Sequence, residues 1–128
     1  MDNKSIREAV NLWCENKKLA IEKYGEINNW DTSKVTDMNK LFYHKKHFND
    51  NIENWDVSNV TNMAFMFDYA YNFNQPLNNW DVSKVTNMYC MFCGYLSINI
   101  FNNSSKNIKT LNNNIYGNTK VKKIYLII

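Results

Sequence analysis

Cysteine and histidine pairs are the residues of this chain whose types and spacing could first be expected to do chemistry. Cys90 and Cys93 form a C-x-x-C motif, and His44 and His47 flank two lysines. Both residue types bind zinc, and C-x-x-C is a known spacing of zinc ligands. All ligands of one zinc ion must lie within about 2.3 Å of it. The histidines lie in the first and the cysteines in the third of three sequence repeats, which are described below. If these repeats stack as layers, the two pairs are about 10 Å apart. We therefore expect no metal site, and a metal- or thiol-dependent protein that uses Cys90/Cys93 remains the alternative.

Three aspartates form a second candidate, because each is followed two residues later by a serine. The pairs are Asp31–Ser33, Asp56–Ser58 and Asp81–Ser83. Carboxylates at regular intervals could bind a hard cation such as Ca²⁺. The same spacing closes an Asx turn onto the backbone two residues ahead, and we favour this interpretation because no second acidic residue recurs beside the first. The chain also lacks a Ser-His-Asp order, a Gly-rich phosphate loop and a paired-carboxylate pocket, so we expect neither an enzyme nor a cofactor.

These candidates are positioned by an internal repeat of 25 residues. Trp30, Trp55 and Trp80 mark three copies, which read INNWDTSKVTDMNKLF, IENWDVSNVTNMAFMF and LNNWDVSKVTNMYCMF. The second and third copies are identical at 11 of these 16 positions, which chance does not produce. Such a unit cannot bury its apolar face alone, so copies must stack.

Each unit is expected to contain one short strand and one short helix. In the second copy, Met63, Met66, Phe67 and Ala70 have the i, i+3, i+4, i+7 spacing of a two-turn amphipathic helix. The prediction is an α/β solenoid with three repeats at 27–51, 52–76 and 77–101. Its side chains should stack in ladders, which are Trp30, Trp55, Trp80, Val35, Val60, Val85, Met38, Met63, Met88, Phe42, Phe67 and Phe92.

The motif from Trp55 to Leu77 resembles the repeat of a bacterial surface-protein family, the BspA-like or DUF285 class. The family pattern W-D-V-S-x-V-T-N-M-x-x-M-F-x-x-A-x-x-F-N-x-x-L is present here almost verbatim. The resemblance implies a leucine-rich-repeat-like solenoid used for protein–protein interaction or adhesion, without enzymatic activity. Members of this family are often found on the cell surface or secreted.

Residues 1–26 are expected to form a helical cap over the open edge of the first repeat. Ser5 and Glu8 have the spacing of a capping box, and an apolar stripe begins at Ile6. Asn16 should start a second helix, which Gly25 ends.

The C-terminal segment 102–128 departs from the repeat. The next Trp is due at position 105, where the chain has Ser105. Two explanations remain open: a diverged final unit, or a truncated or frame-shifted gene in which A+T-rich coding DNA is read out of frame. A further alternative for the function is therefore a decayed repeat fragment without independent function. An uncapped Ile-Tyr-Leu-Ile-Ile tail favours aggregation in either case.

Composition restricts the function further. The net charge of +3 comes from interspersed Lys and acidic residues, so we expect no nucleic-acid partner. Neither a signal peptide nor a transmembrane segment is visible, which leaves the compartment and the oligomeric state open. The expected partner is a protein, and the expected contact residues vary between copies and lie on the strand and turn side: Glu53, Asn59, Asn78 and Lys84.

Overall fold

The computed structural model describes residues 1–93, which begin with two helices and a short 3₁₀ turn. Helix α1 spans Asn3–Glu15, helix α2 spans Lys17–Tyr24, and the 3₁₀ helix η1 spans Ile27–Asn29. The predicted capping residue of α1 was wrong by three positions. Asp2 is the N-cap, its carboxylate accepting from the amides of Lys4 and Ser5, and the Ser5 hydroxyl accepts from the Asp2 amide in return. An acidic side chain is as good a cap as a serine, and Asp2 places it one turn earlier.

The second helix begins and ends where the sequence predicts. The Asn16 side chain accepts a hydrogen bond from the Leu19 amide at the start of α2. Gly25 follows the last residue with a φ of 76°, a conformation that costs glycine nothing. The apolar stripe of α1, which consists of Ile6, Ala9, Val10 and Trp13, is buried.

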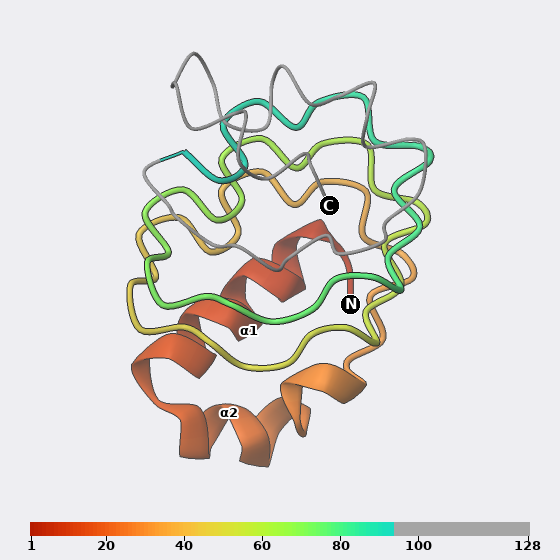
Figure 1. Cartoon of the computed structure of the whole chain (residues 1–128). Helices are drawn as coiled ribbons and strands as arrows, with labels where there is room; N and C mark the ends of the chain where they lie inside the picture. Colours follow the sequence, from red (N-terminus) through yellow and green to blue (C-terminus); the bar gives the residue numbers. More distant parts are fainter. Residues whose placement is uncertain (94–128) are drawn as a thin grey trace.

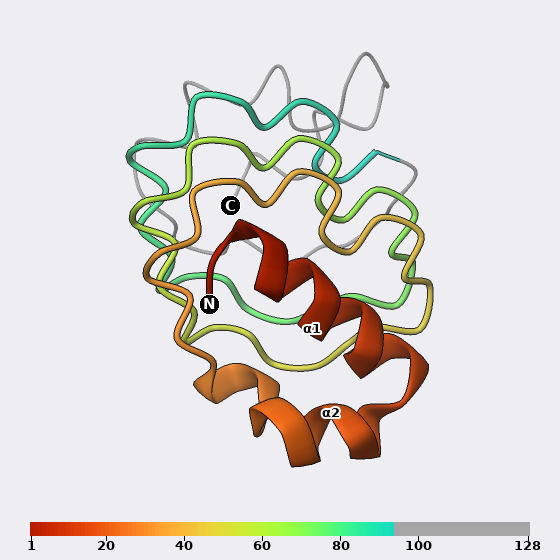
Figure 2. The same ribbon diagram turned by 180° about the vertical axis from the view of Figure 1, so that it is seen from behind.

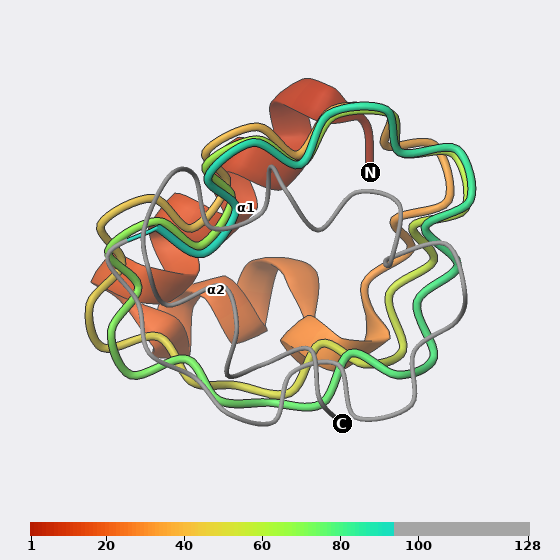
Figure 3. The same ribbon diagram turned by 45° about the horizontal axis from the view of Figure 1, so that its top comes forward.

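After η1 the chain runs in superimposed layers, one per 25-residue repeat (Figures 1 and 3). Parallel β-bridges join Asp37 to Asn62 and Asn62 to Asn87, residues that lie 25 positions apart. These bridges come after the Val-Thr pair of the motif, whereas the alternating apolar and polar segment 52–57, which favours a strand, lies before it. Among residues 1–93 the bridges are isolated and are not part of longer strands.

The predicted helix at Met63–Ala70 is also corrected: the structure has two consecutive β-turns there. The amides of Met66 and Ala70 bond to carbonyl oxygens three residues back, those of Met63 and Phe67. Phe65 and Tyr69, the third residues of these turns, have φ values of 57° and 58°, which an α-helix does not allow.

Bonds between layers use other amides of this segment. Met63, Phe65 and Phe67 donate to the carbonyls of Asn87, Tyr89 and Met91 in the next repeat, at 2.8 to 2.9 Å. In a helix over 63–70 the Phe67 amide would bond to the Met63 carbonyl four residues back, whereas the turns leave it available to pair with the next layer.

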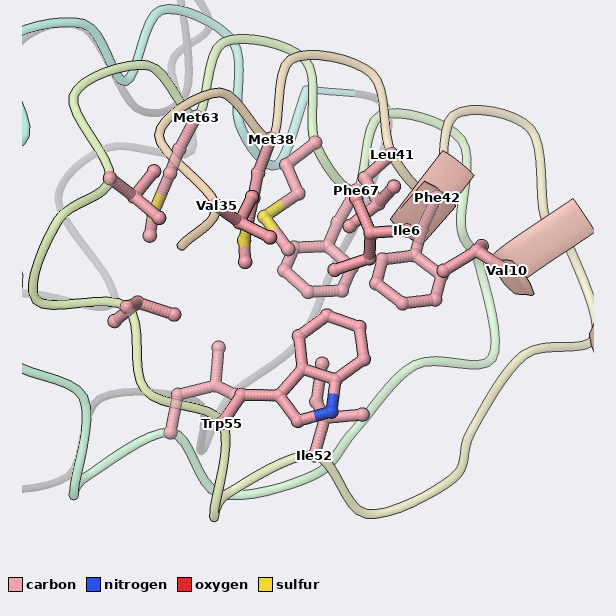
Figure 4. Packing of buried hydrophobic residues seen from close by; sticks show 14 of the residues in the cluster. Ile6, Val10, Val35, Met38, Leu41, Phe42, Ile52, Trp55, Met63 and Phe67 are labelled. Carbon is pink, nitrogen blue, oxygen red and sulfur yellow. The ribbon is translucent and has the colours of Figure 1, made fainter. Parts of the chain in front are cut away.

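The four residues of the predicted helical stripe are nevertheless buried, so the pattern correctly marked the inward side chains. All twelve ladder residues predicted from the sequence also lie in the core. The rings of Phe42, Phe67 and Phe92 stack at 5.3 and 5.4 Å, and Trp30 stacks on Trp55 at 6.0 Å. Figure 4 shows Ile6 and Val10 of α1 beside the ring of Phe42, with Phe67 next to it.

Helix α1 lies along the first repeat on the side that has no preceding layer (Figure 2). The side-chain oxygen Oδ1 of Asn3 accepts from the Thr36 amide at 2.8 Å, in the way that the backbone carbonyl of Thr36 accepts from the Thr61 amide one layer up. The Arg7 guanidinium donates to the carbonyls of Asp37 and Asn39. The corresponding carbonyls of the second repeat receive backbone amides, so Arg7 and Asn3 take the place of a missing layer.

Part of the predicted organisation lies outside the described residues. The third repeat is described up to Cys93, so its end at 94–101 and the segment 102–128 with its two explanations are not covered by the structure.

Candidate binding surface

The contact residues predicted from the sequence are found in two columns of the repeat. Glu53 is half-buried, whereas Asn59, Asn78 and Lys84 are exposed. The structure brings Asn59 and Lys84 together: the Asn59 amide nitrogen donates to the Ser33 carbonyl at 2.8 Å, and Lys84 Nζ donates to Asn59 Oδ1 at 3.0 Å. These two side chains therefore already bond layer to layer.

The aspartate column closes turns, in agreement with the favoured interpretation of the sequence. Asp31 Oδ1 accepts from the Ser33 amide at 3.1 Å and from its hydroxyl at 2.6 Å, and Asp56 does the same with Ser58. These hydrogen bonds hold the pKa of both carboxyls below the usual value, the hydroxyl contributing most. One oxygen of each of these carboxylates is thus used by its own turn.

The cysteines of the C-x-x-C motif are joined as a disulfide, whereas composition and the odd number of cysteines favour reduced thiols. Cys90 and Cys93 have Cα atoms 4.7 Å apart and lie in the last described turn. Within residues 1–93, no group of three or more His, Cys, Asp or Glu side chains is arranged to hold a metal ion. Cys14 is a free thiol, and desolvation raises its pKa, which disfavours the thiolate form that a nucleophile needs.

A cluster of aromatic side chains on the turns was not identified from the sequence. We call it the aromatic edge, and its residues are Tyr43, His44, Phe65, Tyr69, Tyr71 and Tyr89. The four tyrosines are between 37% and 51% exposed, unlike the aromatic residues of the ladders, which are buried. The tyrosine positions hold other residue types in the other copies. Aromatic residues at variable positions of the repeat could have indicated this surface, but a search for residues that recur in every copy does not detect them.

The rings of the aromatic edge contact one another. Tyr69 meets Tyr43 at 6.4 Å and Tyr71 at 5.9 Å, both edge to face, and His44 stacks on Tyr69 at 4.5 Å. Lys40 Nζ lies over the rings of Tyr43 and Phe65, at 5.4 and 5.7 Å from their centroids. The rings thus form two groups, one of Tyr43, His44, Tyr69 and Tyr71 and the other of Phe65 and Tyr89, and the Lys40 cation lies over a ring of each.

Asp68 lies in the same turn as Tyr69 and is only 5% exposed. Its Oδ1 atom is buried and is the one buried side-chain polar atom without a hydrogen bond among the described residues. Desolvation raises the pKa of this carboxyl above 3.8, and His44 opposes the shift in part.

An open groove of about 740 Å³ continues from the aromatic edge at His44. It lies between the end of α1 and the chain segment 44–50, and its lining residues are Trp13, Cys14, Glu15, Lys17, His44, Lys45, Lys46, His47, Phe48, Asn49 and Asp50. Asp50 is held by two donors, Trp13 Nε1 at 2.8 Å and Lys17 Nζ at 2.7 Å. Both histidines that were weighed as zinc ligands are thus found at this groove, on the first repeat, whereas Cys90 lies on the third.

The structure is therefore that of a repeat protein with stacked 25-residue layers and a helical N-terminal segment. The chain belongs to the family described as Mycoplasma protein of unknown function, DUF285, whose model matches residues 10–125. No curated protein and no solved structure matches the chain. Within residues 1–93, no helix is long and apolar enough to span a membrane.

Proposed function

We propose that this chain is a non-enzymatic binding module: a leucine-rich-repeat-like solenoid that contacts a protein partner, as BspA-like surface proteins are expected to do. The observation that carries the proposal is the aromatic edge. Four exposed tyrosines there are not needed to form the repeated core, because the inward columns hold the stacked layers together. Tyrosine is enriched at protein interfaces, where it contributes a large contact area at low entropic cost.

The aromatic edge is a better contact surface than the four residues predicted from the sequence. Asn59 and Lys84 already hydrogen-bond between layers, so a partner would compete with those bonds. Tyr71 is the most exposed of the large apolar side chains among the described residues, at 51%, and its ring contacts that of Tyr69 edge to face.

The test is an affinity pull-down from the source cells with three baits, followed by quantitative mass spectrometry. The baits are the wild-type chain, Tyr69→Ser/Tyr71→Ser, and Glu53→Lys/Asn78→Lys. We expect a protein that is enriched by the wild type and by the second variant but lost with the tyrosine variant.

Loss with the Glu53→Lys/Asn78→Lys bait alone would place the contact on the other face. The proposal fails if no protein is enriched over an unrelated bait. Metal and thiol analysis of the purified chain tests the alternative function, which requires stoichiometric zinc or a reducible Cys90–Cys93 disulfide whose reduction changes activity.

A further inference from the structure

We propose that the partner is recognised through an acidic segment, which lies in the groove beside α1 and continues over the aromatic edge. This inference rests on the proposed function and gives the chemistry of the partner. Two observations support it: lysines without an ion pair among the described residues line the groove, and most carboxylates of the same region are paired or buried.

The lysines of segment 44–50 are the cations available to a partner. Lys45 and Lys46 line the groove, and no ion pair within residues 1–93 engages either of them. Lys40 adds a third cation, which lies over the rings of Tyr43 and Phe65.

The carboxylates in the same region are mostly not available. Asp50 is neutralised by Lys17 and accepts from Trp13, and Asp68 is buried. Glu15 is the remaining acidic residue in the groove lining. Cations thus outnumber free carboxylates, and this charge complements an acidic partner.

The arrangement of the rings favours a peptide over a single-stranded nucleic acid. Bases bind by stacking on free ring faces along a row of cations. Here His44 stacks on one face of Tyr69 at 4.5 Å and Lys40 lies over one face of Tyr43, so each of these rings has one face fewer on which a base could stack. Ring edges and hydroxyls remain, which suit side chains and peptide groups.

The first experiment selects peptides from a random library displayed on phage, with the full chain immobilised. We expect the recovered peptides to be enriched in Asp and Glu. Fluorescence anisotropy with a labelled copy of the best peptide then measures its affinity for three proteins: the wild type, Lys45→Glu/Lys46→Glu and the control Lys4→Glu/Lys34→Glu.

The control changes the net charge by the same amount at exposed lysines outside the groove. We expect the Lys45→Glu/Lys46→Glu variant to bind roughly tenfold more weakly, and the control to stay within about twofold. The wild-type affinity should also fall as salt is raised, since the contacts are charged and partly exposed.

The possible outcomes separate this inference from the proposed function. Neutral or basic peptides, or acidic peptides that bind both variants equally, would overturn the acidic partner while leaving a binding module in place. Recovery of no peptide would overturn the acidic segment, whereas the binding module is overturned only if the pull-down also enriches no protein. Tight binding of a labelled oligo(dT) that is lost in Lys45→Glu/Lys46→Glu would replace the peptide with a nucleic acid.

Discussion

Phe67→Leu tests whether the stacked aromatic ladder holds the layers together. The Phe67 side chain is fully buried, and its ring stacks on Phe42, Phe73 and Phe92 at 5.3, 4.2 and 5.4 Å. An aromatic pair contributes about 0.5–1.5 kcal/mol beyond area burial, and a smaller side chain also leaves a cavity. Leucine retains most of the apolar area, so we expect a loss of about 2–3 kcal/mol in the free energy of unfolding.

The matched control is Phe65→Leu, the same substitution two positions earlier. Phe65 is half-buried and contacts Tyr89 at 5.5 Å, so its replacement should cost about 0.5 kcal/mol. Urea unfolding followed by tryptophan fluorescence measures both, with equal slopes expected for the two variants. The reasoning is refuted if Phe65→Leu costs as much as Phe67→Leu, or if Phe67→Leu costs less than about 0.5 kcal/mol.

Three further predictions test other parts of the structure. Arg7→Met should lower the free energy of unfolding by about 1–2 kcal/mol, because two carbonyls of the first layer lose their donor. The control Lys4→Met, at an exposed site of the same helix, should leave it nearly unchanged. Urea unfolding measures both variants. Lys40→Gly should be more stable than Lys45→Gly by about 1 kcal/mol, since glycine has no strain at the φ of 57° found at Lys40. Asp68→Asn should raise the Tm at neutral pH. Folding raises the pKa of the Asp68 carboxyl, so the wild-type protein becomes less stable as the pH rises above 3.8, and the asparagine variant does not. If calorimetry shows the same difference in Tm between variant and wild type below pH 3.8, the burial argument is wrong.

The sequence was sufficient to predict the repeat and its core. Tryptophans at 25-residue spacing and apolar residues in register identify layers, because only stacked copies place identical side chains against one another. The ends of α2 were also predicted, from Asn16 and Gly25, since their local chemistry does not depend on distant contacts.

The conformation within each layer could not be predicted by the same means. An i, i+3, i+4 apolar pattern fits a helix and also fits successive turns that face inward, so Met63–Ala70 was ambiguous. Hydrogen bonds to the next layer favour the turns over the helix. The Phe65 amide, for example, donates to the Tyr89 carbonyl at 2.9 Å, between residues 24 positions apart. Such pairing depends on the whole stack, which local propensity does not contain.

The candidate surface was missed for a related reason. A comparison of repeats identifies residues that recur, whereas Tyr43, Tyr71 and Tyr89 occur once in their columns and lie outside the core. The disulfide between Cys90 and Cys93 was also missed, because a C-x-x-C motif permits a thiol pair, a disulfide or a metal site until the turn that holds it is known.

The central claim is that each 25-residue unit forms one layer of turns that bonds to the next layer, and amide NOEs measured by NMR test it most directly. The account predicts contacts between the Met63 amide and the Asn87 backbone, and between the Thr61 amide and the Thr36 backbone, with no helical series of i to i+3 contacts over 63–70. A complete helical series over these residues, without contacts between repeats, would contradict it.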